Sequence, residues 1–280
     1  MKIQIHKFHF FLTVLMAFTS CKDWEQTIEL PPNNNTTDSK RVIVMEEFTG
    51  ASCVNCPAGI AISNSIAETY PNNVILIGLH SKFLGAPATK GQVDMRTPDA
   101  QAIEDFLGSW LAKPEAAINR LYQTAGQSYR IGNPDSWKSY VDAELKKAPE
   151  VDLQIKTVYN QTSRKLEVDF TVTTLKVFDK PIHLHCGITQ SGIIADQLDN
   201  QTGKLVGFEH KHVLLKLLSP VSGDRLTNTA TAQQIFKKSY EFTLPQDSIL
   251  WKVEHLDVFG FASLDETEKY ILQGAETKIQ

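Results

Sequence analysis

The hydrophobic period changes once along this chain, and that change constrains the fold more than any other feature of the sequence. Across residues 41–147, apolar runs suited to strands alternate with segments of helical spacing, and the run at residues 74–79 is apolar on both faces. Such alternation predicts βαβ units and a mainly parallel sheet with helices on its faces. Beyond Pro149 the period of the apolar residues becomes two, which predicts antiparallel strands.

The expected elements follow from these two patterns. In the first part the order is strand, helix, strand, helix, strand and helix, at residues 41–48, 57–70, 74–80, 98–107, 115–120 and 134–147. In the second part strands are expected at residues 151–158, 166–172, 182–189, 240–244, 256–262 and 270–278. Because no long helical pattern interrupts the later strands, residues 150–280 are predicted to form an antiparallel β-sandwich after an α/β domain at residues 41–149.

The first twenty residues have the order of an export signal. Two lysines and a histidine precede an apolar run at residues 8–18, and small residues follow it directly before Cys21. The run is shorter than the roughly 20 residues that a membrane-spanning helix needs. Residues 1–20 are therefore predicted to be a signal peptide.

Cys21 stands where bacterial lipoproteins carry their acylated cysteine, and the sequence around it resembles the lipobox of that class. Residues 22–40 lack hydrophobic periodicity and contain the run Pro-Pro-Asn-Asn-Asn, which predicts a flexible tether. We expect residues 21–40 to be a lipidated tether that attaches the protein to a membrane through Cys21. Ordinary secretion is the alternative.

The charge balance excludes one class of partner. The net charge is −4 and the isoelectric point is near 6.1. A nucleic-acid-binding domain carries a basic patch or stripe, and this chain offers none. No nucleic-acid partner is expected.

Two cysteines, Cys53 and Cys56, follow the first expected strand and open the first expected helix. The unpaired NH groups and the positive end of a helix dipole stabilise a thiolate at Cys53, while Cys56 lies one turn further and would be the resolving thiol. Because an exported chain meets an oxidising compartment, a disulfide between the two is expected at rest. Cys186 lies in an alternating apolar run and is expected to be an inert core thiol.

The order of elements around this pair resembles the thioredoxin fold. Glu47 and Phe48 lie six and five positions before Cys53, where that family carries a buried acid and an aromatic residue. Pro114 precedes a strand, where the family carries a cis-proline. The resemblance implies that Glu47 assists proton transfer to the inner cysteine. It also implies that Pro114 faces the disulfide and offers backbone to a bound peptide.

Four positions depart from the thioredoxin pattern. Ser52 replaces the usual Trp, Val54 and Asn55 replace Gly-Pro, and Lys113 precedes the proline where an uncharged residue is common. A structural disulfide on a fold that no longer exchanges disulfides therefore stays open as an alternative.

A closer resemblance covers almost the whole chain after Cys21. Its segments are residues 46–59, 191–193, 210–214 and 271–276. They are similar to the outer membrane protein 28 family, lipoproteins of Bacteroidetes-type bacteria that combine a thioredoxin-like part with a β-sandwich. The resemblance implies a lipoprotein of the outer membrane, on its periplasmic or its cell-surface side.

Two functions of different classes follow from these observations. In the first, Cys53 is the nucleophile, Cys56 the resolving thiol, Glu47 the proton relay and Pro114 the peptide-binding edge. The protein would then exchange disulfides in extracytoplasmic polypeptides and trade electrons with a partner thiol protein, with no small cofactor. In the second, the Cys53–Cys56 disulfide is structural and the sandwich binds a surface partner through its loops.

Metal binding was weighed at two places, and no metal site is expected at either. No second CxxC and no suitably spaced Cys/His pair accompanies Cys53 and Cys56. His183 with His185, and His210 with His212, have the spacing that puts two side chains on one face of a strand. Histidines on strands more commonly face solvent without a metal.

Overall fold

The computed structural model describes residues 40–108, 112–247 and 249–279. The expected signal peptide, Cys21 and all of the expected tether except Lys40 lie outside the described residues. Within the described parts of the chain, no helix is both long enough and apolar enough to span a membrane.

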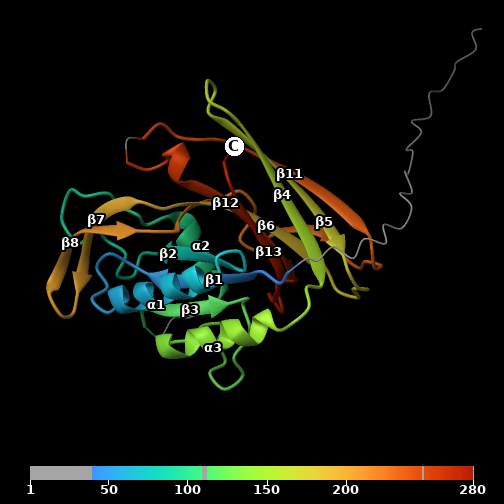
Figure 1. The fold of residues 1–280 in the computed structure, drawn as a ribbon, viewed down its shortest axis with the longest axis horizontal. Helices are drawn as coiled ribbons and strands as arrows, with labels where there is room; N and C mark the ends of the chain where they lie inside the picture. The colour runs from blue at the N-terminus through green and yellow to red at the C-terminus, as the bar shows by residue number, and fades with distance from the viewer. Residues whose placement is uncertain (1–39, 109–111, 248, 280) are drawn as a thin grey trace, which may run out of the picture. The chain divides into compact units, whose positions relative to one another are not determined.

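A mixed sheet of eight strands lies at the centre of the described part of the chain (Figure 1). Its strands are β1 (Ile43–Thr49), β2 (Val74–His80), β3 (Glu115–Ile118), β6 (Ile182–Gln190), β9 (Val213–Leu217), β10 (Asp224–Thr227), β12 (Leu256–Leu264) and β13 (Ile271–Lys278). Seven of them follow the order β13-β12-β6-β9-β2-β1-β3, and β10 pairs with β6. β1 runs parallel to β2 and antiparallel to β3. Gly78 of β2 and Val213 of β9 pair in parallel and join the two halves of the sheet.

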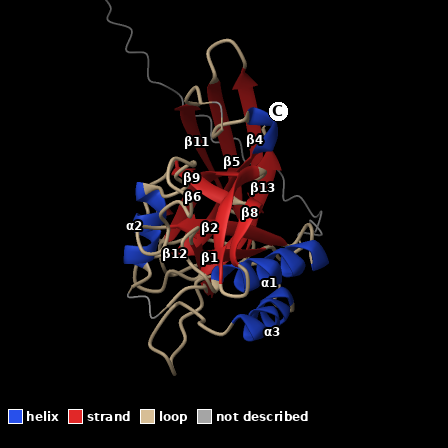
Figure 2. Cartoon of the chain, turned by 90° about the vertical axis from the view of Figure 1, so that its left-hand side faces the viewer, coloured by secondary structure: helices blue, strands red, loops and turns tan. Residues whose placement is uncertain are grey.

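Helices cover both faces of the β1–β3 part of this sheet. Helices α1 (Cys56–Thr69) and α3 (Pro134–Leu145) lie on one side, and α2 (Pro98–Phe106) lies on the other (Figure 2). The alternation along β1 explains the arrangement: Met45 packs with the α1 and α3 side, whereas Val44 and Phe48 pack with the α2 side. Each helix has a proline in its first turn, where a missing NH costs nothing.

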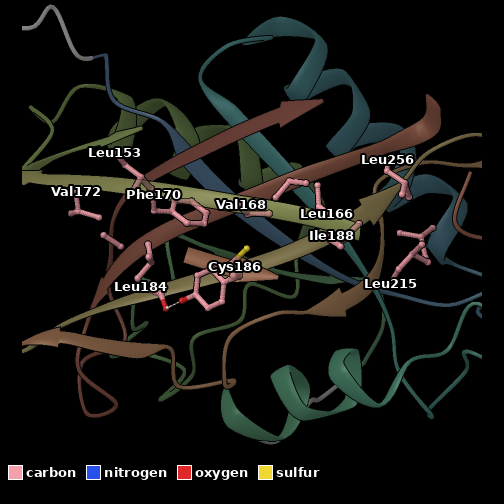
Figure 3. Packing of buried hydrophobic residues seen from close by; sticks show 14 of the residues in the cluster. Leu153, Leu166, Val168, Phe170, Val172, Leu184, Cys186, Ile188, Leu215 and Leu256 are labelled. Atoms are coloured by element: carbon pink, nitrogen blue, oxygen red, sulfur yellow. Dashed lines mark hydrogen bonds between the residues drawn. The ribbon is translucent and has the colours of Figure 1, made fainter. Parts of the chain in front are cut away.

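A three-stranded antiparallel sheet packs against the other half of the large sheet. It has the order β11-β5-β4, with β4 at Val151–Asn160, β5 at Lys165–Thr174 and β11 at Ile235–Thr243. Val168 and Phe170 of β5 share a core with Leu184 and Cys186 of β6 (Figure 3). The predicted alternation therefore has its physical cause in two facing apolar surfaces.

A two-stranded antiparallel sheet stands apart from the other two. It is a hairpin of β7 (Ile193–Asp199) and β8 (Gly203–His210), and in Figure 1 it lies at the end of the molecule that holds the start of α1. β7 contacts α1. This hairpin forms part of the candidate site.

The architecture is a mixed α/β sheet with two smaller antiparallel sheets. Every predicted strand and helix is present, with ends shifted by a few residues, whereas β7, β8, β9 and β10 were not predicted. The boundary expected near residues 149–150 falls between α3 and β4. Strands from both sides of it nevertheless share the eight-stranded sheet, and the described residues belong to one compact unit.

Candidate functional site

Cys53 and Cys56 are joined in a disulfide at the start of helix α1. The S–S distance is 2.08 Å and the two Cα atoms are 5.3 Å apart. The turn that follows β1 sets this geometry, because the NH of Cys53 donates to the carbonyl of Gly50 at 3.0 Å and the NH of Cys56 donates to that of Cys53 at 3.2 Å. The expected pairing is therefore present, at the helix end that favours a thiolate.

The disulfide lies beneath an apolar cover. Cys53 is 1% exposed and Cys56 is 0% exposed. Both pack with Ile60 of α1, and the partly buried Leu84 and Phe208 lie against them. Phe208 comes from β8, so a side chain more than 150 positions later in the sequence closes the site.

Polar contacts hold the same hairpin on the cysteine loop. The side-chain NH2 of Gln197 donates to the carbonyls of Gly50 at 3.1 Å and Cys53 at 3.0 Å. Just after it, the NH groups of Leu198 and Asn200 donate to the carbonyls of Ala51 at 2.8 Å and Val54 at 2.9 Å. Since the residues involved lie about 140 positions apart, no local sequence pattern could have indicated them.

Glu47 is a buried acid on the face of β1 that α1 covers. It is 2% exposed, and its Oε2 accepts a hydrogen bond of 2.6 Å from the hydroxyl of Ser63, which lies two helical turns after Cys56. Its Oε1 has no hydrogen-bond partner among the described residues. Burial raises the pKa of Glu47 to about 7, although the Ser63 hydrogen bond acts in the opposite direction.

A cavity of about 10 Å³ lies beside Glu47. Its polar lining includes Thr49, His80 and His210, and Gly78 contributes no side chain. His80 and His210 contact each other edge to face, with ring centroids 5.6 Å apart. Burial lowers the pKa of His210 to about 4 and holds that of His80 well below its usual value, so both rings are neutral at pH 7.

Lys113 bridges the end of β1 and the loop beyond β2, and Pro114 packs against α1. The peptide bond between them is cis, and a Cβ on Gly59 of α1 would lie 2.7 Å from the Pro114 ring. The ammonium of Lys113 donates to the carbonyls of Thr49 at 2.9 Å and Phe83 at 2.8 Å. Lys113, which stands where the thioredoxin pattern has an uncharged residue, is therefore a buried cation. It acts as a clamp, because it joins the two segments that flank the cysteine loop.

A buried acid accompanies this clamp. The Lys113 ammonium lies 3.4 Å from a carboxylate oxygen of Glu104 and donates to the Ser81 hydroxyl at 2.6 Å, while Ser81 in turn donates to Glu104. Burial lowers the pKa of Lys113 to about 8, and Glu104 partly offsets that effect. Lys113 thus carries its charge at pH 7 within a partnered environment.

The histidine pairs His183/His185 and His210/His212 have different surroundings. His183 Nδ1 lies 2.8 Å from the Ser222 carbonyl, and His185 Nε2 lies 2.9 Å from the Ser263 hydroxyl. His210 lies beside His80 instead. Among the described residues, no group of three or more His, Cys, Asp or Glu side chains is arranged to hold a metal ion. Cys186 is a buried free thiol whose pKa burial raises, which fits the expected inert role.

A groove of about 510 Å³ lies far along the sheet from the disulfide. Its lining comes from the start of β2, from β4 and from β13, and includes Asp152, Leu153, Ile155 and Gln273. It is roomier than the cavity beside Glu47, and it offers both polar and apolar contacts.

Two solved structures share this fold. HBP35 of Porphyromonas gingivalis is 21% identical with a TM-score of 0.67, and the match covers 86% of this chain and 76% of that one. Protein AGR_C_4864 from Agrobacterium tumefaciens is 11% identical with a TM-score of 0.51, and the match covers 86% of this chain and 97% of that one. At these identities the likeness concerns the fold alone. No curated protein matches the chain.

A family model matches most of the second half of the chain and part of the first half. Residues 107–271 match the family described as Outer membrane protein Omp28. The match begins after Cys53 and Cys56, so it carries no information about the disulfide itself. It spans more than half of the chain and includes β7 and β8, which cover the disulfide. The chain therefore belongs to the outer membrane protein Omp28 family.

Proposed function

We propose that this protein is an outer membrane lipoprotein that exchanges disulfides with extracytoplasmic polypeptides through Cys53 and Cys56. Residues 41–149 would form its thioredoxin-like part and residues 150–280 its β-sandwich part. The placement of helices on both faces of β1–β3, and the disulfide at the start of α1, support this assignment.

One observation carries the proposal: Glu47 is buried behind the cysteine helix with its pKa raised to about 7. A shift of this size corresponds to roughly 3 kcal/mol of lost stability at pH above 7, since each pKa unit is worth about 1.4 kcal/mol. Acids kept at such a cost gather at sites that transfer protons. An inert disulfide needs no such acid.

The proposed reaction starts from the disulfide. A thiolate of the partner attacks Cys53 Sγ, the Cys53–Cys56 bond breaks, and a mixed disulfide forms between the partner and Cys53. Cys56 leaves as a thiolate and takes the proton of the neutral Glu47 carboxyl. A second thiolate of the partner then attacks the partner's own sulfur in the mixed disulfide and releases Cys53. The partner has lost two electrons and holds a disulfide, while this protein holds the Cys56 thiol and a Cys53 thiolate, which takes its proton from water, as does Glu47; the same steps in reverse oxidise it again.

Pro114 and the cavity have supporting roles in this scheme. The cavity beside Glu47 has about the volume that one water molecule needs, and a water held there would exchange protons with the carboxyl. Pro114 lies against Gly59, one turn after Cys56, and would present its backbone to a bound polypeptide. The partner that supplies or accepts the electrons is another thiol protein, and the exchange uses no small cofactor.

The reduction potential of the pair, measured together with the pKa of Cys53, tests the proposal. We expect a potential in the range of known exchange proteins, roughly −120 to −270 mV, and a Cys53 pKa below about 8.5. A potential below roughly −300 mV with an ordinary Cys53 pKa would assign the disulfide a structural role and exclude exchange.

The groove favours a second candidate function, a binding module with a structural disulfide. It is lined by strands of both sheets in the proposed sandwich, and an apolar and polar lining of this size suits a ligand or a partner loop. Under this function a Cys53→Ser, Cys56→Ser double variant loses stability and keeps its binding partner. Loss of binding in a folded double variant would contradict it.

The lipid anchor is the third part of the proposal, and membership of an outer membrane family supports it. Several acyl chains on Cys21 would hold the protein at the bilayer, since one chain gives only marginal attachment. We expect Cys21→Ser to leave the protein soluble or unprocessed without unfolding residues 40–279. A wild-type protein that fractionates as soluble, and whose Cys21 carries no acyl mass, would rule out the anchor.

A further inference from the structure

The disulfide cannot react in the arrangement observed. A thiolate must approach Cys53 Sγ along the line of the S–S bond, and Cys53 is 1% exposed. Its cover comes from Leu84 and from Phe208 of β8. Removing the β7–β8 hairpin would therefore open one side of the disulfide.

The hairpin is fixed at its base, where Ile193 and Ala195 pack in the main hydrophobic core, and its outer part, residues 197–208, covers the cysteine loop. It forms a sheet of its own, and two-stranded hairpins are at best marginally stable alone. Gly192, just before β7, has a φ of +72°, and His212, just after β8, has a φ of +54°. The chain thus bends at both ends of the hairpin, and the register of the hairpin shifts between Ala195 and Gln197, where its base meets the part that covers the disulfide.

The cysteine loop offers the hairpin a row of backbone acceptors. The carbonyls of Ala51, Cys53 and Val54 all accept hydrogen bonds from residues 197–200. Two of these donors, on Leu198 and Asn200, are backbone NH groups two positions apart, which is the spacing of one edge of an extended strand. Any extended polypeptide presents donors at this spacing, so the loop can pair with other chains in the same way.

We propose that residues 51–54 are a docking edge for an extended polypeptide and that the β7–β8 hairpin occupies this edge as a removable cover. A partner segment displaces residues 197–200, Phe208 leaves the disulfide, and a thiol of the partner reaches Cys53. Naming the partner as a thiol protein rests on the proposed function. The cover and the docking edge do not depend on it.

Reduction of the disulfide by dithiothreitol measures the cover directly. Phe208→Ala and Gln197→Ala each remove a contact that holds the hairpin down, and we expect each to raise the reduction rate about tenfold. The matched control is Val206→Ala, because Val206 is on the same strand and is 78% exposed. It should change the rate by less than about twofold. Equal rates in all four folded proteins would overturn the cover.

Amide hydrogen exchange in the wild-type protein keeps the test independent of how the variants fold. The NH groups of Leu198 and Asn200 should exchange roughly 100-fold faster than that of Gly78, which is bonded to His212 inside the large sheet. Exchange of all three only on global unfolding would mean that the hairpin never lifts.

An unfolded polypeptide tests the docking edge. Carboxymethylated, unfolded lysozyme has no free thiol, so it can compete for residues 51–54 without any redox step. We expect it to speed exchange at Leu198 and Asn200 severalfold and to leave Gly78 unchanged. Unchanged exchange at Leu198 and Asn200 would contradict docking at this edge.

The outcomes separate this inference from the proposed function. If the hairpin lifts but the reduction potential is that of a structural disulfide, the removable cover is supported and disulfide exchange is excluded. A protein that exchanges disulfides while Leu198 and Asn200 stay protected supports the proposed function and overturns the inference.

Discussion

Glu47 is the side chain on which the proposed chemistry depends most. Its neutral form is the one that folding favours, because burial disfavours the carboxylate and Ser63 only partly offsets that effect. A neutral carboxyl near pH 7 can supply a proton to a leaving thiolate, which an ordinary Glu cannot do.

The pH dependence of stability tests this state of Glu47. With a pKa of about 7 in the folded protein and 4.5 as its ordinary value, the unfolded chain releases this proton at lower pH than the folded one does. Folding stability should therefore fall as pH rises from about 4.5 to 7, by roughly 3 kcal/mol relative to Glu47→Gln. Urea unfolding of the wild-type protein and of Glu47→Gln at about pH 4 and about pH 8 measures the difference between their free energies of unfolding. The contributions of His80 and His210 cancel in this difference, because both proteins contain these residues. Equal differences at the two pH values would contradict the raised pKa.

Lys113 gives a second prediction at the scale of one residue. Lys113→Met removes the cation and leaves Glu104 buried without its charge partner, so we expect a loss of about 3–5 kcal/mol in the free energy of unfolding. Adding Glu104→Gln should restore much of that loss, because the uncompensated charge is then gone. Chemical denaturation of the single and double variants measures both effects. A double variant no more stable than Lys113→Met alone would mean that the clamp acts through its carbonyl contacts only.

Among the elements, the contact between β5 and β12 depends on a glycine. A Cβ on Gly260 would lie 2.3 Å from the Phe170 ring and 3.0 Å from the His185 carbonyl. We expect Gly260→Ala to destabilise the protein by about 1–3 kcal/mol, since either the Phe170 ring or the strand must shift. Gly126→Ala is the matched control, because a Cβ there meets nothing within 4 Å. Equal denaturation midpoints for the two variants would show that β5 and β12 adapt freely.

The elements also show what the sequence could and could not indicate. β5 alternates buried and exposed residues because one face meets β6, and that alternation is visible in the sequence. β8 has no such alternation, because its partner is β7 alone and most of its residues are exposed. The Cys53–Cys56 pair could be predicted from its spacing, and the buried acid Glu47 from the resemblance to the thioredoxin fold. The cover by Phe208 and Gln197 could not, because it arises from tertiary contacts between distant segments.

At the scale of the whole molecule, the shared sheet predicts cooperative unfolding. β2 and β9 join strands from both sides of residues 149–150, and the described residues belong to one compact unit. Two variants that keep only Trp137 or only Trp251 would report on α3 and on the segment before β12. We expect their fluorescence transitions in urea to coincide. Separate transitions would assign the two parts to independent folding units.

The two ends of the described chain are fastened to each other. Arg41 donates a hydrogen bond to the carbonyl of Ile271 at 2.9 Å. The side chain of Gln273 accepts a hydrogen bond from the NH of Val42 and donates one to the carbonyl of Lys40. The first strand therefore gains some of its partners only when β13 has been made. If the chain is exported starting from its N-terminus, the cysteine loop has to wait for residues 197–208, and the contacts of residues 40–42 with β13 form only near the end of export. During that interval Cys53 and Cys56 would be uncovered thiols, open to an oxidant before the hairpin covers them.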